Sequence, residues 1–193
     1  MVVVTNPVDV MTNLVAKTTG FDKKRVFGMG ASLDAARFAN LIHQELNAPV
    51  STIEAVVIGS HGQTMVPAPE VTIVSGKPLT KLLNKETIGK LTQDTVMRGA
   101  SIVSHLGSGS AYFAPAAAIA DIVKAIVNDE KRAIGVCAYL EGEYGVKDLY
   151  LGFFAKIGKC GIENIVGLQL NKEEKEAFVK SADSIRQQNT VLS

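Results

Sequence analysis

The spacing of the apolar residues changes near residue 50, and this change constrains the fold of the chain most strongly. Before it, an apolar strand over 2–4 leads into a helical pattern over 8–18, and a strand over 25–28 leads into a helix over 32–46. From residue 50 to residue 78 the pattern is instead that of short strands separated by turns. The sequence therefore predicts an α+β fold of mixed helices and antiparallel hairpins, with a residual α/β piece at the start.

The remaining elements follow from the same periodicities and from the residues that cap helices. Ser32 and Asn171 are each expected to cap the helix that follows, because their side chains can accept a backbone N–H bond. The full set of predicted elements after residue 46 comprises strands over 50–59, 71–75, 133–138, 149–156 and 161–170, and helices over 79–84, 87–106, 112–128 and 172–188.

Composition excludes several partner classes. The 193 residues carry a net charge of +1, and the basic residues form no cluster beyond Lys23-Lys24-Arg25. The chain has no tryptophan, which argues against a surface on which bases stack. We therefore expect neither nucleic acid nor an anionic membrane as a partner.

The cysteines and the most apolar stretch indicate the cellular environment expected for the chain. Cys137 and Cys160 are isolated, so we expect two buried free thiols in a reducing, cytoplasmic environment and no metal site. The alanine-rich stretch 114–127 is short and contains Asp121 and Lys124. It is predicted to be a buried helix and not a membrane span.

Four polar residues at the ends of predicted elements form a candidate active site. His61 lies where the apolar run 55–58 breaks into a glycine-flanked turn, and an imidazole there can take a proton near neutral pH. Asp34 can orient the imidazole, and Arg37, one helical turn later, can bind a carboxylate with two hydrogen bonds. Asn6 follows the first strand, where open sheets present ligand-binding groups. Together these groups suit the oxidation of a 2-hydroxy acid by hydride transfer.

Each of these residues also has a simpler interpretation. Asp34 and Arg37 alone would more often be an ion pair on a helix surface. Asn6 before Pro7 could merely start a turn. A lone histidine is more often structural, as we expect for the other two histidines, one on a helix surface and one near a helix end. The hypothesis depends on finding all four residues at element ends in one chain.

Several motifs resemble those of the lactate/malate dehydrogenase family. The similar segments are Val4-Thr5-Asn6-Pro7-Val8-Asp9, residues 28–38 with Leu33-Asp34-Ala35-Ala36-Arg37, His61-Gly62, Gly142-Glu143-Tyr144-Gly145 and Gly158-Lys159-Cys160-Gly161. The resemblance extends through the whole chain. One departure is Gln63, where many members carry aspartate. We expect this change to adjust the properties of the site without altering the reaction.

The resemblance implies roles for specific residues. His61 and Asp34 would be the catalytic acid/base pair, and Arg37 and Asn6 would bind the substrate. The residues beside the cofactor, NAD or NADP, would be Val4, Thr5, Asn6 and Met29. A homo-oligomer is also implied, because the helix that carries Asp34 lies near a subunit interface in this family.

The nucleotide-binding half of the family is mostly missing from these residues. Gly28-Met29-Gly30 imitates the start of G-x-G-x-x-G, but Leu33 occupies the third glycine position. Gly107-Ser108-Gly109 follows a helix instead of a strand. We therefore expect residues 1–24 to be a remnant of the nucleotide-binding domain and 25–193 to be the catalytic domain. The chain alone should be inactive.

Two residues favour malate over lactate as the substrate. Lactate-type members usually carry an acidic residue in place of Met65, and that residue would repel a second carboxylate. Ala111 is small where lactate enzymes tend to carry threonine, which leaves room for a dicarboxylate. The alternatives are an L-lactate dehydrogenase catalytic domain, or a fragment that acts only as an assembly module.

Overall fold

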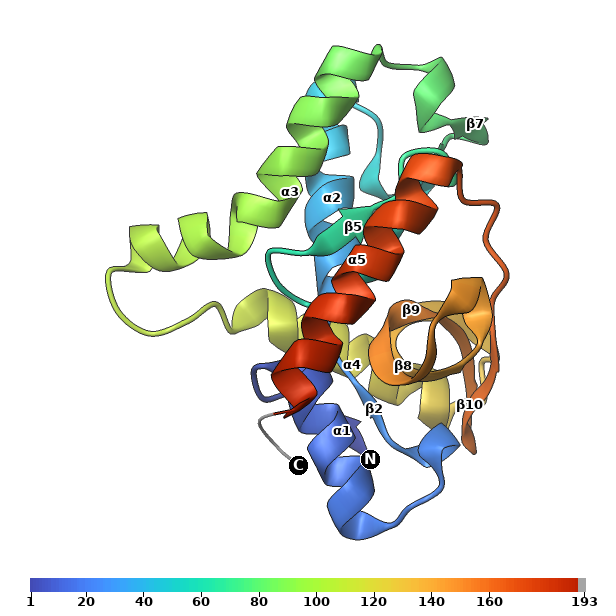
Figure 1. Ribbon diagram of the computed structural model, residues 1–193. Coiled ribbons are helices and arrows are strands. Elements are labelled where there is room, and N and C mark those ends of the chain that lie inside the picture. Colours follow the sequence, from blue (N-terminus) through green and yellow to red (C-terminus); the bar gives the residue numbers. More distant parts are fainter. Residues whose placement is uncertain (191–193) are drawn as a thin grey trace.

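A mixed seven-stranded sheet with helices around it forms the body of the molecule (Figure 1). The computed structural model describes residues 1–190. Its α-helices are α1 (Val8–Thr19), α2 (Ala31–Leu46), α3 (Lys85–Leu106), α4 (Phe113–Val127) and α5 (Lys172–Asn189). Its strands are β1 (Val2–Val3), β2 (Phe27–Gly28), β3 (Ile53–Glu54), β4 (Val57–Gly59), β5 (Met65–Pro67), β6 (Ile73–Val74), β7 (Lys77–Pro78), β8 (Arg132–Glu141), β9 (Lys147–Gly158) and β10 (Gly161–Ile165).

The strand order confirms the predicted fold class. The large sheet runs β1-β2-β8-β9-β4-β5, and β10 pairs with β9. Strands β1 and β2 are parallel and are joined through α1, whereas the other pairs of this sheet are antiparallel. A short α/β unit at the start thus continues into an antiparallel sheet. Strands β3, β6 and β7 form a separate small sheet.

The long hairpin of β8 and β9 carries the core because its apolar side chains face helices. Leu151 and Phe153 on β9 pack in one buried cluster with Phe178 and Ile185 of α5. The rings of Phe153 and Phe178 lie 5.3 Å apart, edge to face. Helix α5 begins as predicted, at Asn171, where a reciprocal capping box with Glu174 satisfies two backbone N–H groups.

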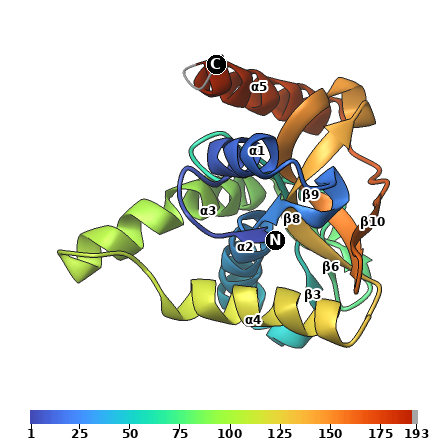
Figure 2. The same cartoon turned by 90° about the horizontal axis from the view of Figure 1, so that it is seen from below.

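Helix α4 corrects one expectation. The alanine-rich stretch 114–127 was expected to be buried, but only Ile122 and Ala125 of α4 are, and they pack near Ile134 and Val136 of β8. Much of the helix is exposed, including Phe113 (80%), Val127 (75%) and Val123 (44%). In both views the connection between α3 and α4 reaches away from the body (Figures 1 and 2). High hydropathy here marks an apolar surface and not a core element.

Other local predictions differ in their boundaries. The strand expected over 50–59 is divided into a 3₁₀ turn η2 (Val50–Thr52), β3 and β4, which belong to different sheets. The strand expected over 161–170 ends at Ile165. Ser32 does not cap α2: the helix starts one residue earlier, at Ala31, and the buried Ser32 hydroxyl has no hydrogen-bond partner within residues 1–190.

The cysteines follow the prediction only in part. Both are free thiols; Cys137 is buried, but Cys160 is exposed in the β9–β10 turn and was wrongly expected to be buried. Within residues 1–190, no helix is both long and apolar enough to cross a membrane. In the same residues, no group of three or more His, Cys, Asp or Glu side chains is arranged to hold a metal ion.

Candidate active site

His61 emerges just after β4, at the edge of a cavity. Strand β4 is held between β5 and β9, and Gly59 turns the chain out of the strand with a φ of 82°. A Cβ atom on Gly30 would lie 3.0 Å from the His61 Cβ, so a larger residue there would push the histidine aside. The sequence thus fixes the imidazole between the end of β4 and the start of α2.

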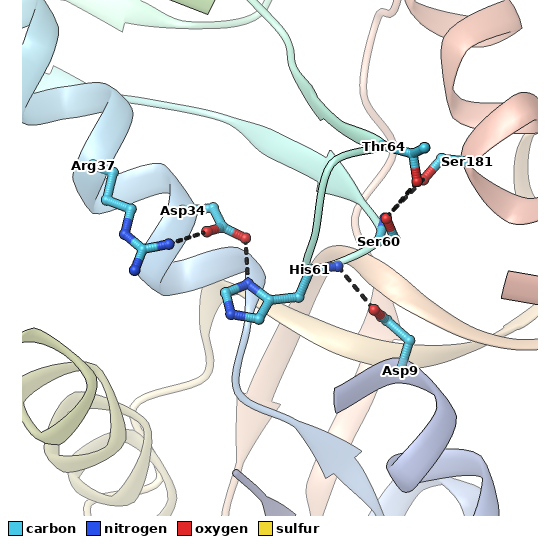
Figure 3. A network of polar contacts seen from close by, with 7 residues as sticks. All are labelled: Asp9, Asp34, Arg37, Ser60, His61, Thr64 and Ser181. Atoms are coloured by element: carbon cyan, nitrogen blue, oxygen red, sulfur yellow. Dashed lines mark hydrogen bonds and ion pairs between the residues drawn. The ribbon is translucent and has the colours of Figure 1, made fainter. Parts of the chain in front are cut away.

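Asp34 connects the imidazole to the guanidinium. Its Oδ2 lies 2.6 Å from His61 Nδ1, and its Oδ1 accepts a hydrogen bond of 3.1 Å from Arg37 Nη1 (Figure 3). The Asp34 side chain is 1% exposed, so this is a buried arrangement and not an ion pair on a helix surface. One carboxylate on the first turn of α2 therefore orients two different side chains.

The pKa of His61 is raised above 6.5 by its surroundings. Burial alone would lower the pKa, but the hydrogen bond and the negative charge of Asp34 outweigh that effect. Asp9 adds to the increase in pKa, whereas the positive charge of Arg37 opposes it. The imidazolium is thus stabilised while its Nε2 remains available to a ligand.

A cavity of about 580 Å³ brings most of the predicted residues together. It is lined by Asn6, Arg37, His61, Met65 and Ala111 from five parts of the chain. Val96, Gly99 and Val103 of α3 complete one wall. His61, both substrate-binding candidates and both specificity candidates therefore line one cavity.

Apart from Asn6, the cofactor candidates lie outside this cavity. Val4 is 49% exposed beyond the end of β1, and the neighbouring Thr5 is also exposed. Met29 is 5% exposed and packs in the core with Phe27 and Leu33. Neither Val4, Thr5 nor Met29 lines the cavity that contains His61.

Arg37 has donors to spare for an anion. Within residues 1–190 its hydrogen bonding goes to Asp34, and its buried Nε has no partner there. The guanidinium lines the cavity beside α3, where a Cβ on Gly99 would approach its Nη1 to 3.4 Å. A carboxylate in the cavity could accept hydrogen bonds from the Nη atoms of this guanidinium.

Two buried side chains that the sequence reasoning did not single out hold the His61 turn (Figure 3). Asp9 on α1 accepts a hydrogen bond of 2.8 Å from the His61 backbone N–H. Ser181 on α5 accepts one of the same length from the Ser60 backbone N–H. The Ser60 hydroxyl also lies 2.6 Å from that of Thr64. The signal for Asp9 in the sequence was a carboxylate between the apolar residues Val8 and Val10, while nothing local to Ser181 marks its role.

Comparison with known proteins identifies the family. Residues 31–191 match the family model for the lactate/malate dehydrogenase α/β C-terminal domain. The chain belongs to the lactate/malate dehydrogenase family. It is 49% identical to a malate dehydrogenase of Methanosarcina acetivorans over 95% of this chain and 60% of the relative, and 45% identical to one of Bacillus cytotoxicus over 100% and 62%. The chain thus spans about three fifths of the length of these curated relatives.

Solved structures from both branches of the family share the fold. A malate dehydrogenase from Salinibacter ruber superposes with a TM-score of 0.93 at 39% identity, covering 96% of this chain and 61% of that one. A lactate dehydrogenase from Cryptosporidium parvum, solved with lactic acid and nicotinamide adenine dinucleotide, has a TM-score of 0.96 at 35% identity and covers 99% and 62%. Because both branches superpose equally well, the fold does not separate malate from lactate.

Proposed function

We propose that this chain is the catalytic part of an NAD(P)-dependent malate dehydrogenase, which interconverts malate and oxaloacetate. The observation that carries the proposal is the buried His61–Asp34 pair facing a cavity lined by Arg37 and Asn6. The curated relatives named above are malate dehydrogenases, which favours this reaction over lactate oxidation.

His61 is the acid/base in this proposal. Asp34 binds Nδ1, so Nε2 is the ring nitrogen left to accept the proton of the substrate hydroxyl. As the hydroxyl proton moves to Nε2, the C2–H bond breaks with its electron pair and the C–O bond becomes a carbonyl. In the reverse direction the imidazolium, stabilised by Asp34, returns the proton to the carbonyl oxygen.

Arg37 and Asn6 position the substrate. The guanidinium of Arg37 lines the cavity and suits the planar carboxylate next to the reacting carbon, because a guanidinium can make two parallel hydrogen bonds. The Asn6 amide lines the same cavity and can hold the substrate hydroxyl.

The cofactor, NAD or NADP, supplies the acceptor for the hydride. Val4 is exposed at the end of β1, next to the segment that carries Asn6, and an apolar side chain beside an amide fits the face and edge of a nicotinamide ring. Thr5, which is exposed, and Met29, which is 5% exposed, are the other two proposed cofactor contacts. The G-x-G-x-x-G fingerprint does not occur in these 193 residues, so we propose that residues outside them bind the phosphates.

The dicarboxylate preference depends on Met65 and Ala111. Both line the cavity, where a neutral Met65 does not repel a second carboxylate and a small Ala111 leaves room for it. L-lactate dehydrogenation is the alternative within the same site.

Assembly and compartment complete the proposal. The exposed apolar side chains of α4 suit burial in a homo-oligomer, and an assembly role alone is the alternative for this chain. Two free thiols are typical of a reducing compartment, the cytoplasm. We propose that residues 1–24 belong structurally to a nucleotide-binding domain and that 25–193 form the catalytic domain.

Reconstitution tests the function directly. The chain is joined to the N-terminal half of the Methanosarcina acetivorans relative, and oxidation of NADH and NADPH is followed with oxaloacetate and with pyruvate. Faster turnover of oxaloacetate supports the proposal, and a preference for pyruvate overturns it. The chain alone should show neither turnover nor micromolar binding of NADH by calorimetry.

A further inference from the structure

Asp9 is a buried carboxylate that the proposed mechanism does not use. It lies on α1 between Val8 and Val10, is 2% exposed, and accepts the His61 backbone N–H at 2.8 Å. Burying a carboxylate is unfavourable unless its interactions compensate. A role beyond packing is therefore required to explain a charge at this position.

The neighbouring backbone N–H, that of Ser60, shows that a neutral side chain is enough to hold the backbone of this turn. The Ser60 N–H is bound by the neutral hydroxyl of Ser181, also at 2.8 Å. Two consecutive amides of one turn are thus held at the same distance, one by a hydroxyl and the next by a carboxylate. A hydroxyl would suffice for His61 as well if fixing the backbone were the only requirement.

We propose that Asp9 is a positioning residue for His61, which fixes the backbone of the turn and places a second negative charge behind the imidazole. The proposal rests on the proposed function for the acid/base role of His61. Asp34 then controls the imidazole from its Nδ1 side, and Asp9 acts from the backbone side without touching the substrate.

The charged and titratable groups around Asp9 and His61 come from several elements. His61 faces Asp34 and Arg37 of α2 and Asp9 of α1, and both carboxylates raise its pKa. Asp9 faces His61, Cys137 of β8 and, more remotely, Asp34. Burial raises the pKa of Asp9, and the His61 N–H hydrogen bond opposes this. Burial, followed by the charge of Asp9, keeps the pKa of the Cys137 thiol well above its usual value, so that thiol stays neutral.

The test measures the titration of His61 by NMR of its ring in the 193-residue chain. Asp9→Asn keeps an oxygen that can accept the backbone N–H but removes the charge. We expect the pKa of His61 to fall in Asp9→Asn and to stay unchanged in the control Asp94→Asn, which removes a charge from an exposed position on α3. An unchanged His61 pKa in folded Asp9→Asn would overturn the proposal.

A second measurement needs no variant to fold. Coupling between two titrating groups is reciprocal, so the Asp9 side-chain carbon of the unmodified chain should show an inflection at the pH where His61 titrates. The absence of that inflection would also overturn the proposal. Neither measurement uses turnover. The role of Asp9 is therefore tested independently of whether the reconstituted enzyme shows malate dehydrogenase activity.

Discussion

Asp34 and His61 are 27 residues apart in the chain, yet Oδ2 of one lies 2.6 Å from Nδ1 of the other. The carboxylate is on the first turn of α2 and the imidazole follows β4, so the contact joins a helix to the end of a strand. Since Asp34 is buried, few water molecules screen its charge from the ring. This contact sets both the tautomer and the basicity of the imidazole.

Replacing Asp34 with asparagine should lower both activity and the pKa of His61. The amide removes the charge that favours the imidazolium, and it can present the wrong hydrogen-bonding group to Nδ1. In the reconstituted enzyme we expect a loss in kcat within the range of roughly 10²–10⁴-fold that general acid–base catalysis supplies. The pH profile of malate oxidation should shift to lower pH. Wild-type turnover with an unshifted profile would contradict the pairing.

Arg37→Lys should impair substrate binding severely. A lysine ammonium is a point charge and cannot reproduce a planar grip with two hydrogen bonds. Steady-state kinetics of the reconstituted enzyme should show a loss in kcat/KM of at least roughly tenfold, as expected for one charge-assisted hydrogen bond. Arg186→Lys, on the exposed face of α5, is the matched control and should behave like the wild type. Equal kcat/KM in both variants would exclude Arg37 as the carboxylate-binding group.

Met65→Glu should change the substrate preference. A carboxylate in the cavity repels the second carboxylate of oxaloacetate more than it affects pyruvate. The ratio of kcat/KM for oxaloacetate over pyruvate should therefore fall, whereas Met97→Glu, at an exposed position of α3, should leave it unchanged. An unaltered ratio in Met65→Glu would remove this residue from the specificity argument.

The raised pKa of His61 predicts how stability depends on pH. A group whose pKa is higher in the folded state than its unfolded value of 6.5 stabilises the fold fully below pH 6.5. This contribution is lost as the pH rises through the folded-state pKa. We compare the free energy of unfolding of the wild type with that of His61→Gln from about pH 5.5 to pH 8.5. The stability advantage of the wild type should be largest at the acid end of this range. Urea titrations measure it, and a difference that grows with pH would refute the assignment.

Phe178→Ala should destabilise the fold without altering the site chemistry. Phe178 is fully buried and packs against the rings of Phe153 and Tyr144. Truncating a buried phenylalanine costs about 3–5 kcal/mol, because it removes apolar contacts and leaves a cavity. Val179→Ala, at the next and partly exposed position, is the control and should cost much less in the same denaturation experiment.

The sequence predicted the helices whose caps and apolar spacing agree. The Asn171 cap and the polar first turn after it indicated α5 directly, and the spacing after Pro7 indicated α1. Helix α4 was predicted at nearly the right residues, but its predicted burial was wrong, because hydropathy counts apolar side chains without showing whether another element covers them. The run 50–59 divides between two sheets, and a local apolar pattern does not specify which partner each half will find.

Local sequence patterns predicted the contacts within one element of the site and missed those that depend on how separate elements pack. Arg37 and Asp34 are three residues apart on one helix, so their contact follows from helical geometry. The contact between Asp9 and His61 spans 52 residues and depends on how α1 packs beside the β4 end. No local pattern encodes a packing arrangement of this kind, whereas resemblance to a family can transfer the roles of His61 and Asp34.

The hydrogen bond from Ser60 to Ser181 has a consequence for the order in which the site forms. The two residues are 121 positions apart. The backbone of the turn that carries His61 is therefore held in place only after α5 has packed against it. Contacts of such long sequence separation are slow to form because a large loop must close first. During synthesis, Asp34 and His61 are already translated while their alignment is still incomplete. The backbone of the turn that carries His61 therefore gains its hydrogen bond to Ser181 only when α5 docks.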